Sequence, residues 1–112
     1  MKSRLNYVEL PATDMAKTRK FYEAAFGWAL VEFGPTYAAT TTNDVDIGLQ
    51  ADRADAPRAP LPIVHVENLE AALKTVIAAG GAITKPIFSF PGGKRFHVRD
   101  PSGNELAVWQ TA

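Results

Sequence analysis

Hydrophobic and polar residues alternate near the start of the chain and again just past its middle. Residues 5–10 alternate and end at Pro11, and residues 61–66 form a second run of this kind, so both runs are predicted to be strands. A helical pattern follows each strand. In the first predicted helix, the apolar residues on one face are Met15, Phe21, Tyr22, Ala25 and Phe26. In the second predicted helix, they are Leu69, Leu73, Val76, Ile77 and Ala79.

The boundaries of the two predicted helices carry matching signals. Thr13 or Asp14 is suited to cap the first helix and Asn68 the second, while Gly27 and Gly80-Gly81 end them. Gly27 and Gly81 lie 54 positions apart, and the same offset relates Asp14 to Asn68 and Tyr7 to Leu61. A repeat of about half the chain predicts two similar modules, with the ligand site between them.

Three further strands are predicted after each helix. They cover residues 28–33, 36–41 and 45–50 in the first half, and 82–87, 94–99 and 105–109 in the second. Each half is therefore predicted to be β-α-β-β-β. We expect a single α+β domain, with module 1 at residues 1–50, a linker at 51–60 and module 2 at 61–112.

The amino-acid composition argues against several classes of function. The 112 residues include 12 Lys and Arg and 12 Asp and Glu, with no basic run, so nucleic-acid binding is not expected. The chain has no cysteine, which excludes disulfides and thiolate chemistry. No apolar stretch approaches the roughly 18–20 residues of a membrane span. We expect a cytoplasmic protein that does not contact membranes.

Two motifs resemble those of the vicinal oxygen chelate superfamily, which includes glyoxalase I, bleomycin-resistance proteins and extradiol dioxygenases. They are Lys-Phe-Tyr-Glu-Ala-Ala-Phe-Gly-Trp at 20–28 and Asp-Pro-Ser-Gly-Asn at 100–104, in this order within the two-module repeat. The resemblance implies that the modules form a partly open, curled sheet around a cleft. It also implies a homodimer.

In family enzymes the cleft holds a divalent metal, with ligands from the first and last strands of each module. The resemblance places the corresponding positions at Tyr7, Gly48, Leu61 and Ala107. A divalent ion needs several carboxylate, imidazole or carbonyl donors, which Leu, Gly and Ala side chains lack. We therefore expect no metal or other cofactor. A divalent metal displaced along the cleft, with Glu9, His65, Asp46 and Glu105 as ligands, is the alternative.

Strand alternation predicts which other side chains line the cleft. If Tyr7 faces it, Glu9 and His65 face it too, and these two are the candidate catalytic acid and base. The predicted ligand-binding residues are Tyr7, Asp46, Gln50, Glu105 and Trp109. Each also has a structural interpretation, as a packed aromatic or a solvated polar residue.

Three functions remain open at this point. The first is a metal-independent relative of bleomycin-resistance proteins that binds a small aromatic or hydrophobic molecule. The second is a metal-dependent or acid/base lyase, isomerase or dioxygenase of the same superfamily. The third is an accessory interaction protein whose cleft is filled by side chains, so the sequence leaves open whether the chain is an enzyme.

Overall fold

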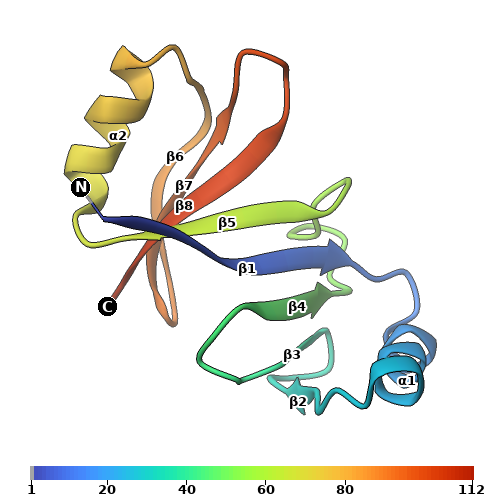
Figure 1. Cartoon of the computed structure of the whole chain (residues 1–112). Helices are drawn as coiled ribbons and strands as arrows, with labels where there is room; N and C mark the ends of the chain where they lie inside the picture. The colour runs from blue at the N-terminus through green and yellow to red at the C-terminus, as the bar shows by residue number, and fades with distance from the viewer. Residues whose placement is uncertain (1) are drawn as a thin grey trace. The chain divides into compact units, whose positions relative to one another are not determined.

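The computed structural model describes residues 2–112 (Figure 1). These residues form, in order, β1 (Ser3–Pro11), α1 (Met15–Phe26), β2 (Val31–Glu32), β3 (Tyr37–Ala39), β4 (Asp46–Gln50), β5 (Leu61–Val66), α2 (Leu69–Ala78), β6 (Ala82–Phe90), β7 (Gly93–Arg99) and β8 (Glu105–Thr111). The predicted α+β class with two β-α-β-β-β modules is confirmed. Across residues 2–112, neither helix is long and apolar enough to span a membrane.

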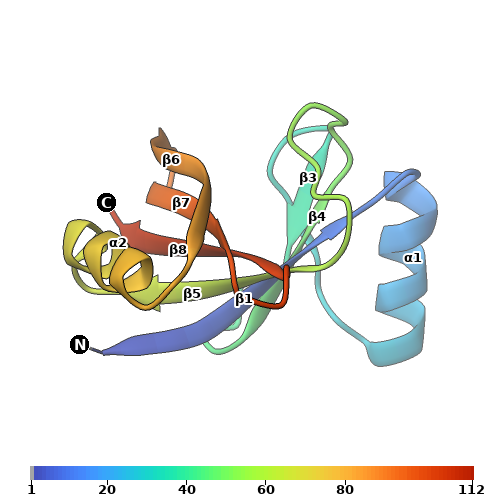
Figure 2. The same cartoon turned by 90° about the horizontal axis from the view of Figure 1, so that it is seen from above.

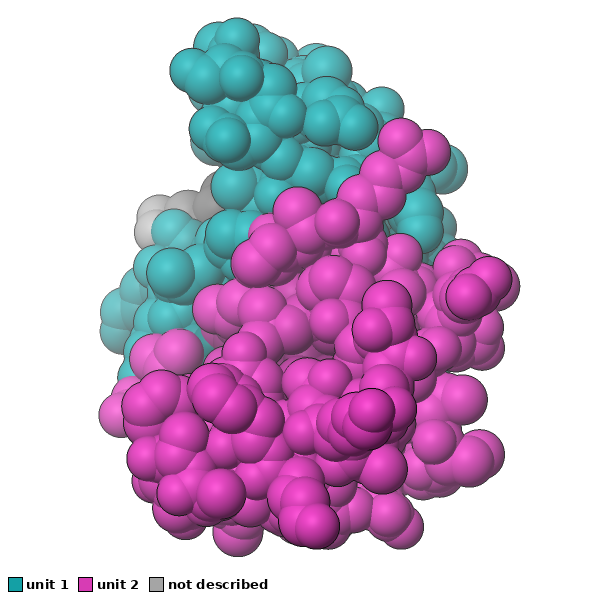
Figure 3. All heavy atoms as spheres, turned by 90° about the vertical axis from the view of Figure 1, so that its right-hand side faces the viewer, with its two compact units in different colours: residues 1–6, 62–112 teal, residues 7–61 magenta. Residues whose placement is uncertain are grey.

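The chain divides into two compact units (Figure 3). Unit 2 is Tyr7–Leu61, and unit 1 joins Pro62–Ala112 to the residues up to Asn6, so the division falls inside β1. The strands follow the order β2-β3-β4-β1 in the first module and β6-β7-β8-β5 in the second. In each, the module's first strand pairs with its last in parallel, and the other pairs are antiparallel.

Helix α1 of unit 2 begins and ends where the sequence predicts. The Asp14 carboxylate accepts a hydrogen bond from the Lys17 backbone N–H at 3.0 Å, which satisfies a donor of the first turn. Gly27 has φ of 70°, and its N–H donates to the Glu23 carbonyl at 3.0 Å. This left-handed residue ends the helix at low steric cost because glycine has no Cβ.

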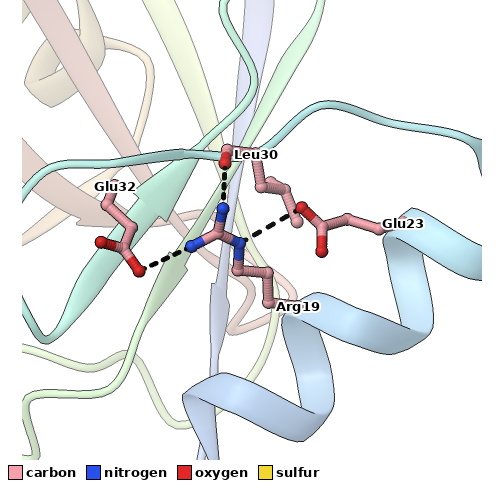
Figure 4. Close-up of polar contacts among 4 residues, drawn as sticks. All are labelled: Arg19, Glu23, Leu30 and Glu32. Atoms are coloured by element: carbon pink, nitrogen blue, oxygen red, sulfur yellow. Dashed lines mark hydrogen bonds and ion pairs between the residues drawn. The ribbon is translucent and has the colours of Figure 1, made fainter.

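Arg19 ties α1 to the chain that follows it (Figure 4). Its guanidinium donates to the carboxylates of Glu23 at 3.2 Å and Glu32 at 2.7 Å, and to the Leu30 carbonyl at 2.9 Å. None of the residues of α1 is fully buried. The helix is therefore held by this polar contact and by partial packing of Met15 and Tyr22 on the unit 2 core.

Unit 1 contains a larger apolar core between α2 and its strands. Figure 2 shows α2 beside the strands of the same unit. The Asn68 side chain accepts from the Ala71 N–H at 3.0 Å, and Gln110 accepts from the Leu69 N–H at 2.8 Å, so both cap the helix start. The buried core consists of Val66, Leu69, Ala72, Phe96, Val98 and Val108.

The structure corrects several predicted boundaries. Strands β2 and β3 are shorter than predicted, whereas β6 and β7 extend to a tight turn and form one long hairpin. Gly80, one of the two glycines predicted to end α2, is its left-handed residue, with φ of 104°. Gly81 is instead needed for close packing, because an added Cβ would lie 2.7 Å from a Val76 methyl and 2.8 Å from a Val98 methyl.

Candidate functional site

The sheet of unit 2 has one face toward α1 and one face opposite it. Leu10, Ile47 and Leu49 pack in the core with residues of α1. Because successive strand residues point to opposite faces, Tyr7, Glu9 and Gly48 lie on the other face. Tyr7 is level with Asp46, and Glu9 with Gly48, in the parallel pairing of β1 with β4.

Two tyrosine hydroxyls meet on this face of the unit 2 sheet. The hydroxyls of Tyr7 in β1 and Tyr37 in β3 are hydrogen-bonded to each other, and both side chains are half-buried. They stand directly over Gly48 of β4: an added Cβ there would overlap both hydroxyl oxygens and would lie 2.7 Å from Tyr37 Cζ. Residue 48 must therefore be glycine for this pair of phenols to form.

The predicted polar residues of unit 2 have different environments. Glu9 is only 4% exposed, so it is a buried carboxyl rather than a solvated one. Asp46 Oδ1 accepts from the hydroxyls of Thr40 and Thr42 and from the Thr42 N–H at 2.7–2.8 Å. Burial raises the pKa of Asp46, but these hydrogen bonds outweigh it, and the pKa lies below its ordinary value.

Asp46 and Gln50 both support local backbone. The Asp46 carboxylate orders the turn between β3 and β4, and Gln50 accepts a hydrogen bond from the Asp52 N–H at 2.9 Å. Their side chains hold the ends of β4 in place, and their roles as ligand-binding residues stay predictions.

In unit 1, aromatic residues and one arginine form a row across four strands on the face opposite α2. Register places His65 of β5 beside Trp109 of β8, which lies beside Arg95 of β7 and then Phe88 of β6. The His65 ring meets Trp109 edge-on at 4.8 Å, and Phe90 lies 6.1 Å from Trp109. We call His65, Phe88, Phe90, Arg95 and Trp109 the aromatic row.

Polar contacts fix the orientation of the aromatic row. The Trp109 indole N–H donates to the Asn6 side chain at 3.2 Å, and His65 Nε2 lies 2.9 Å from the Thr111 hydroxyl. The Arg95 guanidinium lies over the rings of Phe88 at 5.3 Å and Phe90 at 5.6 Å, in the range of cation–π attraction. The row therefore combines flat apolar surface with fixed polar groups.

His97 is a buried histidine beside this row. Its Nδ1 lies 3.7 Å from Glu105 Oε2, which also accepts from the Thr84 hydroxyl at 2.8 Å, and its buried Nε2 has no hydrogen-bond partner. Burial lowers the pKa of His97 to about 4, helped by Arg95 and Lys85 and opposed by Glu105. The imidazole is therefore neutral at neutral pH.

This pKa predicts a loss of stability in mild acid. An unfolded histidine binds a proton near pH 6.5, whereas His97 in the folded chain does so only near pH 4. Between these values the unfolded state holds more protons, so the free energy of unfolding falls by about 2–3 kcal/mol as pH decreases. Urea unfolding of wild type and His97→Phe across this range measures the effect. The variant should show a flatter profile, and parallel profiles would contradict the assignment.

The four family ligand positions do not fit a divalent metal. Gly48 has no side chain, and the tyrosine hydroxyls fill the space that one would need. Leu61 is 2% exposed and Ala107 0% exposed, and both are apolar. Over residues 2–112, no three His, Asp or Glu side chains are grouped so that they could hold a metal ion.

A small pocket lies elsewhere in unit 2. It has a volume of about 110 Å³ and is lined by Trp28, Thr40, Thr42, Val45 and Ile47. It shares none of the predicted site residues, and it is smaller than the roughly 300 Å³ at which drug-sized ligand sites begin. We therefore place candidate ligand contacts on the sheet face opposite the helix in each unit, considered separately, and not in this pocket.

The predicted site residues did not include five residues of these faces, namely Tyr37, Phe88, Phe90, Arg95 and His97. Tyr37 was not predicted as a site residue because the pairing register of β3 with β4 depends on the turn between these strands. Its position within the strand predicted at 36–41 could have marked it as a candidate. His97 and Arg95 alternate with the core residues Phe96 and Val98, which identifies their face once the core is known. In contrast, His65, Trp109 and Glu105 lie in unit 1 on the face that alternation predicts.

Comparison with known proteins agrees with this fold and these motifs. The model of the Glyoxalase/Bleomycin resistance protein/Dioxygenase superfamily matches residues 4–108. The chain therefore belongs to this superfamily, as its two motifs and its paired modules indicate.

Individual relatives are more distant. The chain is 28% identical over 116 residues to "Putative glyoxylase CFP32" of Mycobacterium tuberculosis, covering 94% of this chain and 44% of that protein. It thus spans less than half the length of this relative. A Mn(II)-bound glyoxalase from Novosphingobium aromaticivorans is 23% identical with a TM-score of 0.70, covering 97% of this chain and 40% of that one.

A second solved structure with the same fold is that of a protein named for a different activity. Methylmalonyl-CoA epimerase from Mycobacterium tuberculosis is 14% identical with a TM-score of 0.73, covering 96% of this chain and 87% of that one. At these identities the structural likeness shows the fold, and the functions of the neighbours differ from one another. The chemistry must therefore be argued from the residues of this chain.

Proposed function

We propose that this chain is a glyoxalase/bleomycin-resistance-like protein that binds a small aromatic or hydrophobic molecule without the family metal. The observation that carries the proposal is the pair of tyrosine hydroxyls over Gly48. Tyr7 and Gly48 are two of the four positions that the family resemblance assigns to metal ligands. A phenol pair lacks the carboxylate and imidazole donors that a divalent ion requires.

The aromatic row of unit 1, taken by itself, is a surface suited to an aromatic ligand. Trp109, Phe88 and Phe90 supply flat apolar surface, and Arg95 and His65 supply polar groups beside it. Pockets that bind small organic molecules combine mainly apolar walls with a few fixed polar groups. Rings stacked or edge-on against such residues gain about 0.5–1.5 kcal/mol beyond their buried area.

Titration calorimetry with neutral aromatic compounds tests this function. The probes are 4-nitrotoluene, indole and 2-methylnaphthalene, each added to wild type and to Trp109→Leu. Trp28→Leu is the matched control, because Trp28 is the other tryptophan and lies outside the aromatic row. We expect saturable binding that Trp109→Leu weakens and Trp28→Leu retains. The absence of binding by all three probes would contradict the proposed function.

A homodimer is the assembly that we propose for this chain. The face of α1 and its following residues exposes large aromatic side chains: Phe21 and Phe26 are each 59% exposed and Trp28 is 38% exposed. Tyr22 stacks on Trp28 at 5.5 Å, so the rings form one patch. Exposed apolar patches of this kind mark interaction sites, and the neutral net charge gives little repulsion between copies.

A charge in this patch is predicted to separate the dimer. Phe26→Glu should convert a dimer to a monomer in size-exclusion chromatography with light scattering, because a carboxylate is costly to bury at an interface. Ile77→Glu is the control, since Ile77 is 53% exposed on α2. A wild-type monomer, or a dimer that survives Phe26→Glu and dissociates with Ile77→Glu, would contradict this assembly.

A further inference from the structure

The imidazole of His97 in unit 1 has a buried nitrogen that the rest of the chain does not satisfy. The residue is only 5% exposed, and across residues 2–112 its Nε2 has no hydrogen-bond partner. A buried polar atom that lacks a partner costs free energy, so such an atom in a folded protein calls for a physical explanation. A ligand group that hydrogen-bonds to Nε2 on binding is one.

Glu105 determines where the ring of His97 carries its proton. Oε2 of Glu105 lies 3.7 Å from His97 Nδ1 and also accepts from the Thr84 hydroxyl at 2.8 Å, which holds the carboxylate beside this nitrogen. A carboxylate favours a proton on the imidazole nitrogen that faces it. Because the pKa of His97 is about 4, the ring has a single proton at neutral pH, and we assign it to Nδ1. Nε2 is then a lone-pair acceptor.

This acceptor lies beside the aromatic row. His97 and Arg95 alternate with core residues of β7, so both are on the face opposite α2, and the His97 ring is 5.8 Å from the ring of Phe88. In β6, the edge strand of unit 1, the register with β7 shifts on both sides of Lys85, which is the partner of His97. Bulges are frequent next to active sites, and β6 is held here by an interrupted ladder. The strand can therefore yield to a ligand group that approaches from the row.

The charges around His97 favour a neutral ligand group. Arg95 of β7 and Lys85 of β6 act on the ring with positive charge, and Glu105 of β8 acts on it with negative charge. A cationic group would be repelled by the first two residues, and an anionic group by the third. A hydroxyl or an N–H avoids both penalties and still presents a hydrogen to Nε2. A ring with a pKa of about 4 is also a weak base, so it accepts a hydrogen bond and does not remove the proton.

We propose that Nε2 of His97 accepts a hydrogen bond from a neutral hydroxyl or N–H group of the aromatic ligand. This inference rests on the proposed function and narrows its ligand class to aromatic compounds that carry such a donor, for example a protonated phenol. The ring of the ligand lies against the aromatic row, and its donor supplies the hydrogen bond that the chain does not. His97 is thus a specificity-determining residue for the ligand.

Two nearly isosteric probes test the inference. 2-Naphthol and 2-methylnaphthalene differ by a hydroxyl in place of a methyl group, and a phenolic hydroxyl of this kind stays protonated at neutral pH. Each is titrated by calorimetry into wild type, His97→Phe and His65→Phe. His97→Phe keeps a ring but removes the acceptor. His65→Phe is the matched change at the other histidine, whose Nε2 already lies 2.9 Å from the Thr111 hydroxyl.

The expected result is a change in the ratio of the two affinities. The affinity for 2-naphthol divided by that for 2-methylnaphthalene should be about five- to tenfold higher in wild type than in His97→Phe, because the variant leaves the hydroxyl without an acceptor. His65 contacts Trp109, so His65→Phe is expected to weaken both probes and to keep their ratio. Melting curves establish that each variant is folded during the titration.

Nitrogen NMR gives a second readout that requires no change at position 97. In ¹⁵N-labelled chain, Nε2 of His97 should resonate as an unprotonated nitrogen and should shift toward the position of a protonated one when 2-naphthol binds. 2-Methylnaphthalene should not cause this shift. The chain has two histidines, so the spectrum of His65→Phe identifies the signals of His97.

The contrary results separate this inference from the proposed function. An affinity ratio that is the same in wild type and His97→Phe, or an Nε2 signal that does not respond to bound 2-naphthol, would overturn the His97 site, while binding of 2-methylnaphthalene would still support the aromatic-binding function. If 2-methylnaphthalene binds and 2-naphthol does not, the His97 site is likewise overturned. If 2-naphthol, 2-methylnaphthalene, indole and 4-nitrotoluene all fail to bind, both proposals are overturned.

Discussion

Gly48→Ala is expected to destabilise the folded chain by about 1–3 kcal/mol, the usual cost of forcing extra atoms into a packed site. The added Cβ would overlap the hydroxyl oxygens of Tyr7 and Tyr37, and Tyr37 Cζ would lie 2.7 Å away. The rings are stiff, so the tyrosines must rotate away and their mutual hydrogen bond must break. Urea unfolding measures the loss.

A mutant cycle isolates the cause of this effect. Gly48→Ala is compared in wild type and in a chain carrying Tyr7→Phe and Tyr37→Ala, in which the hydroxyls and one ring are absent. If the clash is the cause, the alanine should cost much less in the second background. An equal cost in both backgrounds would show that glycine at this position serves the backbone of β4 rather than the tyrosine pair.

Phe96→Ala is expected to have the largest effect on stability, about 3–5 kcal/mol. Phe96 is 0% exposed and lies in the unit 1 core with Val66, Leu69 and Val108. Removing its ring loses buried apolar area and leaves a cavity that a β-sheet packed against a helix cannot fully close. Because small domains have only about 5–15 kcal/mol of stability in total, this single change should bring the chain close to unfolding.

Phe33→Ala provides the comparison for Phe96→Ala. Phe33 is the same residue type but is 57% exposed, so its removal should change the free energy of unfolding by about 0.5 kcal/mol or less. Denaturant midpoints of the two variants test this contrast. Similar losses from both would mean that the core of unit 1 does not have the boundaries described above.

The sequence predicted much of the fold because its local signals agree with one another. Asp14, Asn68 and Gly27 have a chemistry that suits helix ends, and they act there in the structure. Strand β5 has the predicted bounds because residues that favour strands lie between Pro60 and Asn68, the cap of the second helix. The repeat, found from an offset of 54 positions, matches the shared strand order of the two modules.

The remaining features depend on contacts between distant residues, which a local pattern does not encode. The Tyr7–Tyr37 pair requires β3 to lie beside β4 in a register set by a turn, and Asp46 is drawn into that same turn by Thr40 and Thr42. The close approach of Gly81 to Val98 of β7 is likewise a contact between distant residues. These are tertiary effects.

Metal binding is the most direct test of the claim that this superfamily member works without the family metal. The melting temperature is measured after chelation and after adding Zn, Ni, Mn, Fe(II) or Mg, together with elemental analysis of the purified protein. We predict no stoichiometric ion and no shift. A bound ion at a hundredfold its Kd stabilises by about 2.7 kcal/mol, or roughly 4–8 °C in a domain of this size. A stoichiometric ion with such a shift would contradict the account.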